Sequence, residues 1–117
     1  MREREDEWTD RMRRAISGES GAYGRPPKAI APDVTQPDSI AAAAAQLQRL
    51  DILVNNAGIG HVGSIETTEP EDFDRLMNVN VRAVYLVTRG LMPLLLAAAE
   101  RGPVGTIVNI ASVAGQV

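Results

Sequence analysis

Apolar residues in this chain gather into three short runs separated by longer polar-patterned segments. The segment 28–34 is a short strand candidate. A second run, 50–58, ends in Asn-Asn and Gly, as expected of a parallel strand that is buried on both faces and followed by a turn. The last run, 105–112, is apolar and β-branched and also predicts a strand.

The segments between these runs predict two helices. The first, over 35–50, has a proline and an acid in its first turn and continues in alanines of high helix propensity. The second, over 69–100, follows a capping box in which Thr68 caps the helix and Glu71 stands at its third position. Its apolar residues recur every three or four positions, and Pro93 predicts a bend or a break near its end.

This alternation of strands and helices predicts an α/β fold built on a parallel sheet with helices on its faces. It begins only near residue 29, so the chain divides into 1–28 and 29–117. The first segment opens with mixed charges and passes into Ser, Gly and Pro, which break regular structure. Although Trp8, Met12 and Ile16 form a thin apolar stripe, we expect a loosely ordered N-terminal arm.

Composition removes several classes of function. The chain of 117 residues, 44% of them apolar, has room for one domain, and its net charge of −3 gives no reason to expect nucleic acid or an anionic membrane as a partner. It has no cysteine and one histidine, His61, so we expect no disulfide, no thiolate chemistry and no metal site. The charged start is unlike a signal peptide, and we expect a cytoplasmic protein.

Polar residues follow the predicted strands at their carboxyl ends. Asp33 closes the first strand, Asn55 and Asn56 close the second, and Asn109 and Ser112 close the third. In open α/β sheets this edge is where ligands bind. By itself the pattern supports only a ligand site of unknown type.

Three motifs make the interpretation more specific. Asp51 followed by ILVNNAG looks like the DxLVNNAG signature of the short-chain dehydrogenase/reductase (SDR) family. The segment 79–81 resembles the VN segment in the long helix of that family, and 107–115 resembles its IVNxSSxxG strand end, with Ala111 in place of the first serine. The resemblance covers 29–117 in the family's order and spacing. It implies part of a Rossmann-type doubly wound parallel sheet, comprising the third to fifth strands and the helices between them.

The resemblance also implies roles for individual residues. Asp33 matches the residue that hydrogen-bonds the adenine ring of the cofactor, which would be NAD or NADP. The cofactor's adenosine side would be lined by Asn55, Asn56, Ala57 and Gly58. As catalytic residues, Asn80 matches the asparagine that holds a water in a proton relay, and Ser112 matches the serine that orients the substrate carbonyl or hydroxyl.

Each of these residues also has a purely structural explanation. Asp33 could be a residue of a turn or helix entry, and Asn55 and Asn56 could tie loops together through side-chain to backbone hydrogen bonds. Asn80 could be a tolerated polar residue in a helix, and Ser112 an ordinary turn serine. We expect His61 to be a loop residue without a chemical role.

Two further family motifs are not found in these residues. The resemblance implies a YxxxK pair, whose tyrosine is the general acid or base, about a dozen residues beyond Ser112, and the sequence ends five residues after that serine. Neither Tyr23 nor Tyr85 has a lysine four residues on. The glycines at 18–24 follow no apolar strand, so we expect a loop there and no TGxxxGxG phosphate-binding turn.

We therefore expect part of an NAD(P)-dependent oxidoreductase that interconverts an alcohol and a carbonyl, inactive by itself and a poor cofactor binder. Two alternatives remain open. One is a translated, non-catalytic remnant. The other is a module that forms a homo-oligomer through the 69–100 helix, because this helix lies at the subunit interface in many family members. The substrate, the direction of the reaction and the choice of nicotinamide are not given by these residues.

Overall fold

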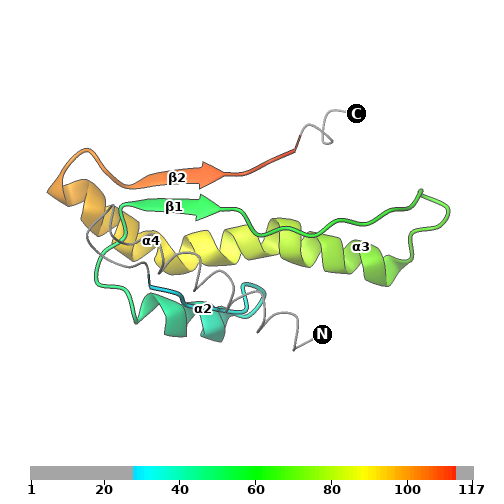
Figure 1. The fold of residues 1–117 in the computed structure, drawn as a ribbon, viewed down its shortest axis with the longest axis horizontal. Helices are drawn as coiled ribbons and strands as arrows, with labels where there is room; N and C mark the ends of the chain where they lie inside the picture. The colour runs from blue at the N-terminus through cyan, green and yellow to red at the C-terminus, as the bar shows by residue number, and fades with distance from the viewer. Residues whose placement is uncertain (1–27, 113–117) are drawn as a thin grey trace, which may run out of the picture. The chain divides into compact units, whose positions relative to one another are not determined.

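A computed structural model describes residues 28–112 of the chain. Within this range the order of elements is α2 (Pro37–Ala44), β1 (Ile52–Asn55), α3 (Pro70–Met77), a π-helical turn η2 (Asn78–Arg82), α4 (Ala83–Arg101) and β2 (Thr106–Asn109), as Figure 1 shows. The predicted N-terminal arm, apart from Lys28, and the glycines at 18–24 lie outside the described residues.

Strands β1 and β2 pair in parallel, with Ile52 opposite Thr106 and Asn55 opposite Asn109. The two strands predicted over 50–58 and 105–112 are therefore confirmed. They are neighbours joined by the long helix, since parallel strands need a crossover connection. Both strands end at the same edge, so the segments that follow Asn55 and Asn109 leave the sheet side by side.

The strand predicted over 28–34 is not formed. This stretch is irregular and turns at Val34 and Thr35. A β-strand is stabilised by backbone hydrogen bonds to a neighbouring strand, and the described sheet contains only β1 and β2. The apolar composition of this segment was therefore not sufficient to predict a strand.

Helix α2 is shorter than the predicted 35–50, since it ends at Ala44. The backbone N–H groups of Gln46 and Leu47 bond to carbonyls three residues back, which tightens the last turn and ends the helix. Ile40 is its buried residue and packs against α4, where Gly90 leaves room for it.

The predicted long helix is confirmed over Pro70–Arg101, with two corrections. The N-cap is Glu69, without a side-chain cap hydrogen bond, so the capping box predicted at Thr68 is wrong; the helix starts one residue too late for that hydroxyl. Of the bend or break predicted near Pro93, the break is wrong, because α4 continues through Pro93 to Arg101. The irregular turn is instead η2, which contains Asn80.

The described helices lie on one side of the two strands (Figure 1). In β1, Leu53 is buried against this side, whereas Ile52 and Val54 point the other way and are 57% and 52% exposed. The prediction of a strand buried on both faces is therefore wrong for the described residues. The open side of the sheet is apolar and carries Ile52, Val54, Thr106, Val108 and Ile110, which we call the open face.

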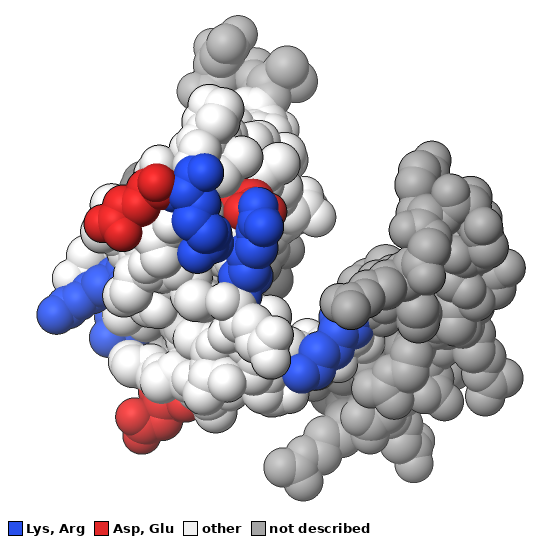
Figure 2. Space-filling view, turned by 90° about the vertical axis from the view of Figure 1, so that its left-hand side faces the viewer, with Lys and Arg blue, Asp and Glu red and all other residues white. Residues whose placement is uncertain are grey.

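By length and composition alone, the helix Pro70–Arg101 is long and apolar enough to cross a membrane. It nevertheless carries Arg82 and Arg89 in its middle and contacts both α2 and β1, which is the arrangement of a helix that covers a sheet. The end of the molecule seen in Figure 2 carries acidic and basic side chains interspersed among uncharged ones, without a field of one sign.

Candidate cofactor and substrate site

The carboxyl ends of β1 and β2 are tied together by one side chain. The Asn55 amide group donates to the Asn109 side-chain oxygen at 2.9 Å and to the Thr88 hydroxyl of α4 at 3.1 Å. The backbone carbonyl of Asn55 accepts a further hydrogen bond from Ile110 N at 2.9 Å. Asn55 therefore connects both strands and the helix at the point where the two site segments begin.

The segment after β1 is held by Asn80 of the π-helical turn. Its side-chain oxygen accepts from Ile59 N at 2.8 Å, and its amide donates to Ile59 O at 2.8 Å. A Cβ at Gly58 would lie 3.3 Å from the same Asn80 oxygen, so glycine permits this close approach. A π-helical turn within an α-helix is frequent at functional sites, and here it carries the side chain that fixes the loop.

An open groove of about 550 Å³ lies where these segments meet. It is lined from β1 and its continuation by Asn55, Asn56, Ala57 and Gly58, from the helix by Asn80, Val81 and Val84, and from β2 and its continuation by Asn109, Ile110, Ala111 and Ser112. The structure thus brings together six of the seven residues predicted from sequence, all except Asp33. Their placement at the carboxyl edge of a parallel sheet is that of a ligand site.

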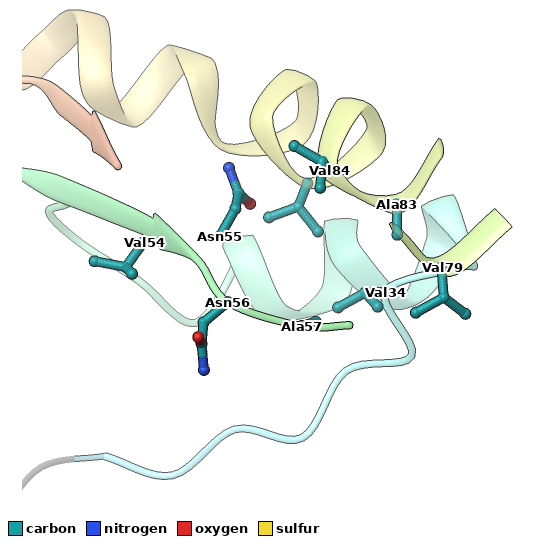
Figure 3. Close-up of a pocket in the computed structure, with 9 residues that line it drawn as sticks. Val34, Val54, Asn55, Asn56, Ala57, Val79, Ala83 and Val84 are labelled. Atoms are coloured by element: carbon teal, nitrogen blue, oxygen red, sulfur yellow. The ribbon is translucent and has the colours of Figure 1, made fainter. Parts of the chain in front are cut away.

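A smaller apolar pocket of about 90 Å³ lies next to the groove and shares Asn55, Asn56, Ala57 and Val84 with it (Figure 3). Its walls are Val34, Val54, Val79, Ala83, Val84 and Val87, together with Asn55, Asn56 and Ala57. In Figure 3 the Asn55 side chain points toward the helix, whereas Asn56 points away from it. Successive side chains of a strand point to opposite faces, so the side chains of the two asparagines have different surroundings.

Asp33 is placed beside this pocket, one residue before Val34, and outside the larger groove. Its carboxylate accepts from the Thr35 hydroxyl at 2.6 Å and from Thr35 N at 2.9 Å. These two hydrogen bonds, the hydroxyl one first, hold the pKa of Asp33 below its ordinary value. The turn role considered from sequence is therefore present, and the carboxylate remains exposed and ionised next to an apolar pocket.

Sequence reasoning missed two residues of this network. Asn109 was noted only as a strand-end residue, and Thr88 was not noted at all, although the structure joins both to Asn55. A polar residue on the sheet-facing side of a helix was the available signal for Thr88. His61 lies exposed in the loop after β1, as expected.

The described residues offer two surfaces that could hold a cofactor. The smaller, valine-walled pocket begins at Val34, and the exposed carboxylate of the preceding residue, Asp33, can accept a hydrogen bond. The larger groove is lined by the strand-end asparagines, Asn80 and Ser112. A glycine at 58 keeps the backbone open to close approach.

Comparisons with known proteins agree with this geometry. The family model described as short chain dehydrogenase matches residues 6–117. The short chain dehydrogenase tazN of Aspergillus terreus is 48% identical over 86 residues, which cover 69% of this chain and 19% of that protein.

Two solved structures have similar folds. A metagenomic short-chain oxidoreductase in complex with NADP is 40% identical, with a TM-score of 0.71 over 89% of this chain and 48% of its own. The 3-ketoacyl-(acyl-carrier-protein) reductase of Brucella melitensis complexed with NADH is 39% identical, with a TM-score of 0.69 over 86% and 43% of the two chains.

The chain spans less than half the length of each of these three relatives. The family match, the relatives and the partial parallel sheet confirm the predicted α/β fold of Rossmann type, and the family is one of nicotinamide-dependent oxidoreductases. The chain therefore belongs to the short-chain dehydrogenase family.

Proposed function

We propose that residues 28–112 form the part of an NAD(P)-dependent oxidoreductase that holds the adenosine end of the cofactor and orients an alcohol or carbonyl substrate. The observation that carries this proposal is the single groove that gathers Asn55–Gly58, Asn80 and Ser112 at the carboxyl edge of β1 and β2. The bound nicotinamide would supply the hydride acceptor or donor.

In this proposal the residues divide the task by position. Asp33 accepts a hydrogen bond from the adenine amine at the mouth of the valine-walled pocket, and Asn56, Ala57 and Gly58 form the floor on which the adenosine lies. Ser112, which lines the same groove, donates to or accepts from the substrate oxygen. Its hydroxyl can serve either a carbonyl or an alcohol, because it is both donor and acceptor.

The proposed relay role of Asn80 is compatible with its structural task. Its carboxamide uses one N–H and one oxygen lone pair on Ile59. A carboxamide offers two N–H groups and two lone pairs, so one of each remains for a water in the groove. The contact with Ile59 and the proposed relay role thus use different N–H groups and different lone pairs of the same carboxamide.

We further propose that these 117 residues do not turn over substrate by themselves. The sequence holds no tyrosine with a lysine four residues on to act as general acid or base. Tyr85 has Arg89 at that spacing, and the two are hydrogen bonded at 3.0 Å, but neither lines the groove. The isolated chain should therefore leave NADPH unoxidised in the presence of aldehydes and ketones.

A chimera tests the proposal directly. Residues 28–112 replace the corresponding segment of the metagenomic short-chain oxidoreductase, which supplies the remaining strands, and NADPH oxidation is followed with a panel of small carbonyl compounds. We expect turnover, and we expect Ser112→Ala to abolish most of it while NADPH affinity stays unchanged. A folded chimera without turnover would favour the alternative of a non-catalytic remnant.

A second proposal concerns a homo-oligomer formed through the long helix. Phe73, Met77, Val81 and Tyr85 follow at intervals of four and are between 42% and 57% exposed, which forms an apolar stripe along one helix face. Two copies of the helix packed antiparallel would place Phe73 of each copy near Tyr85 of the other and would cover the stripe on both, so the occupant that suits the stripe is a second copy of the chain.

Light scattering on the purified chain measures this association. We expect a discrete dimer that Val81→Glu converts to monomer, because the charge enters the middle of the stripe. Arg75→Glu, on the same helix but outside the stripe, is the control and should remain dimeric. A wild-type chain that is monomeric, or that forms aggregates without a discrete size, would contradict the proposal.

A further inference from the structure

The two segments that form the groove lie far apart in the sequence, but both begin at one pair of asparagines, Asn55 and Asn109, which are 54 positions apart. Asn55 ends β1 immediately before Asn56–Gly58, and Asn109 ends β2 three residues before Ser112. The strand register places Asn55 opposite Asn109. An interaction that holds the Asn55 and Asn109 side chains in position relative to each other therefore also holds the first residues of both groove segments.

The Asn55 amide is shared between two acceptors from different elements. It has two N–H groups, and the structure gives it the Asn109 oxygen at 2.9 Å and the Thr88 hydroxyl at 3.1 Å. Asn55 and Thr88 are both half-buried between the sheet and the helix. Without the hydroxyl, one N–H in a partly dry environment would lack an acceptor, and the amide would rotate to find another.

We infer that Thr88 is a positioning residue for the site: by holding the Asn55 amide in the plane that reaches Asn109, its hydroxyl sets the spacing between the cofactor segment 56–58 and Ser112. Thr88 lines neither the groove nor the valine-walled pocket, so it acts through Asn55 and touches no ligand. The inference rests on the proposed function only where it calls 56–58 a cofactor segment and Ser112 a substrate residue.

The alternative is that Thr88 only fastens the helix to the sheet. The two explanations differ in what a change at Thr88 does to residues it does not contact. A fastening role predicts lower stability and an unaltered site in the molecules that remain folded. A positioning role predicts that the site itself changes in folded molecules.

The test compares Thr88→Val, which keeps the β-branched shape and removes the hydroxyl, with Thr88→Ser, which keeps the hydroxyl. Backbone amide resonances of Gly58 and Ser112 are recorded by NMR in the full chain without cofactor, so the result does not depend on catalysis. We expect Thr88→Val to shift both resonances and Thr88→Ser to leave them in place. Thr106→Val makes the same chemical change on β2, where the described structure gives the hydroxyl no hydrogen bond, and should shift neither.

Shifts confined to Thr88 and Asn55, or equal shifts in the Ser and Val variants, would overturn the inference. If Thr88→Val unfolds the isolated chain, the same resonances and kcat per folded molecule are measured in the chimera described above, where further strands support the sheet. There we expect kcat to fall about tenfold in Thr88→Val, since small displacements of reacting groups are costly, and to recover in Thr88→Ser. Unchanged resonances and kcat in folded Thr88→Val would reject a positioning role.

Discussion

At the scale of single residues, the Asn80 carboxamide is the main attachment of the loop that follows β1. It makes two hydrogen bonds of 2.8 Å with the backbone of one residue, accepting from Ile59 N and donating to Ile59 O. We expect Asn80→Ala to lower the free energy of unfolding by about 1 kcal/mol, because the bonds are partly exposed and each contributes modestly. Urea unfolding of the chain measures the change.

Asn78→Ala provides the control for this prediction. Asn78 belongs to the same π-helical turn, and no described partner receives a hydrogen bond from its side chain. Asn78→Ala therefore gains the same helix propensity as Asn80→Ala but loses no contact with the loop. Equal stability changes in the two variants would mean that the Ile59 contacts contribute nothing.

The pKa of Asp33 is a second prediction at this scale. The Thr35 hydroxyl stabilises the carboxylate form, so Thr35→Val should raise the pKa of Asp33 toward its ordinary value, although the bond from Thr35 N remains. Thr35→Ser should keep it low. An NMR titration that follows the Asp33 carboxyl carbon measures the pKa in both variants.

The lowered pKa also sets a direction for stability. The contribution of Asp33 is present at pH values above its unfolded-state pKa and is lost as the pH falls through the lower folded-state pKa. A Thr35→Val pKa equal to that of the wild type would show that the hydroxyl bond is not formed in solution.

Residue identities were the part of the site most accessible from sequence. The NNAG run, Asn80 and Ser112 each stand in a recognisable motif, and the structure places them around one groove. The partners of these residues were not accessible, because a hydrogen bond such as Asn55 to Thr88 joins positions 33 apart and depends on how the helix crosses the sheet. Thr88 stands in no motif that would have singled it out.

At the scale of elements, the contact between α2 and α4 depends on the absence of a side chain at Gly90. A Cβ there would lie 2.7 Å from Cγ2 of Ile40, the buried residue of α2. An exposed helix would gain about 1 kcal/mol from Gly→Ala, whereas forcing a methyl group into a packed contact costs about 1–3 kcal/mol. We therefore expect Gly90→Ala to be neutral to destabilising rather than stabilising.

A double-mutant cycle with Ile40→Ala separates the two effects. Ile40→Ala removes the methyl group that the new Cβ would meet, so Gly90→Ala should be less harmful, or stabilising, in that background. Thermal unfolding of the four chains gives the coupling free energy. Strict additivity would mean that Ile40 and Gly90 do not meet.

Elements were predicted well in kind and less well in extent. The apolar runs at β1 and β2 and the three-to-four spacing of the long helix were sufficient signals for both strands and for Pro70–Arg101. Local signals failed where tertiary contacts decide the outcome. The capping box at Thr68 was not used, α4 continued through Pro93, and 28–34 pairs with no strand among the described residues. The π-helical turn has no sequence signature and was not foreseen.

At the scale of the whole molecule, one side of the sheet is covered and the open face is not. Parallel sheets occur with both faces buried, so the exposed Ile52 and Val108 mark a surface that is covered in a complete doubly wound sheet. In the isolated chain this apolar surface favours association with other molecules. A polar substitution on the open face should therefore help the isolated chain, where the face is exposed, and destabilise the chimera, where the face is covered.

Val108→Thr tests this expectation. In the isolated chain we expect a larger soluble fraction, because a hydroxyl replaces a methyl group on exposed apolar surface. In the chimera we expect a loss of about 1–3 kcal/mol in the free energy of unfolding, because the same hydroxyl is then buried without a partner. Val62→Thr, at a loop position that is fully exposed, makes the same chemical change and should alter neither quantity. If Val108→Thr leaves the stability of the chimera unchanged, the open face is not the surface on which the second layer of a doubly wound fold packs.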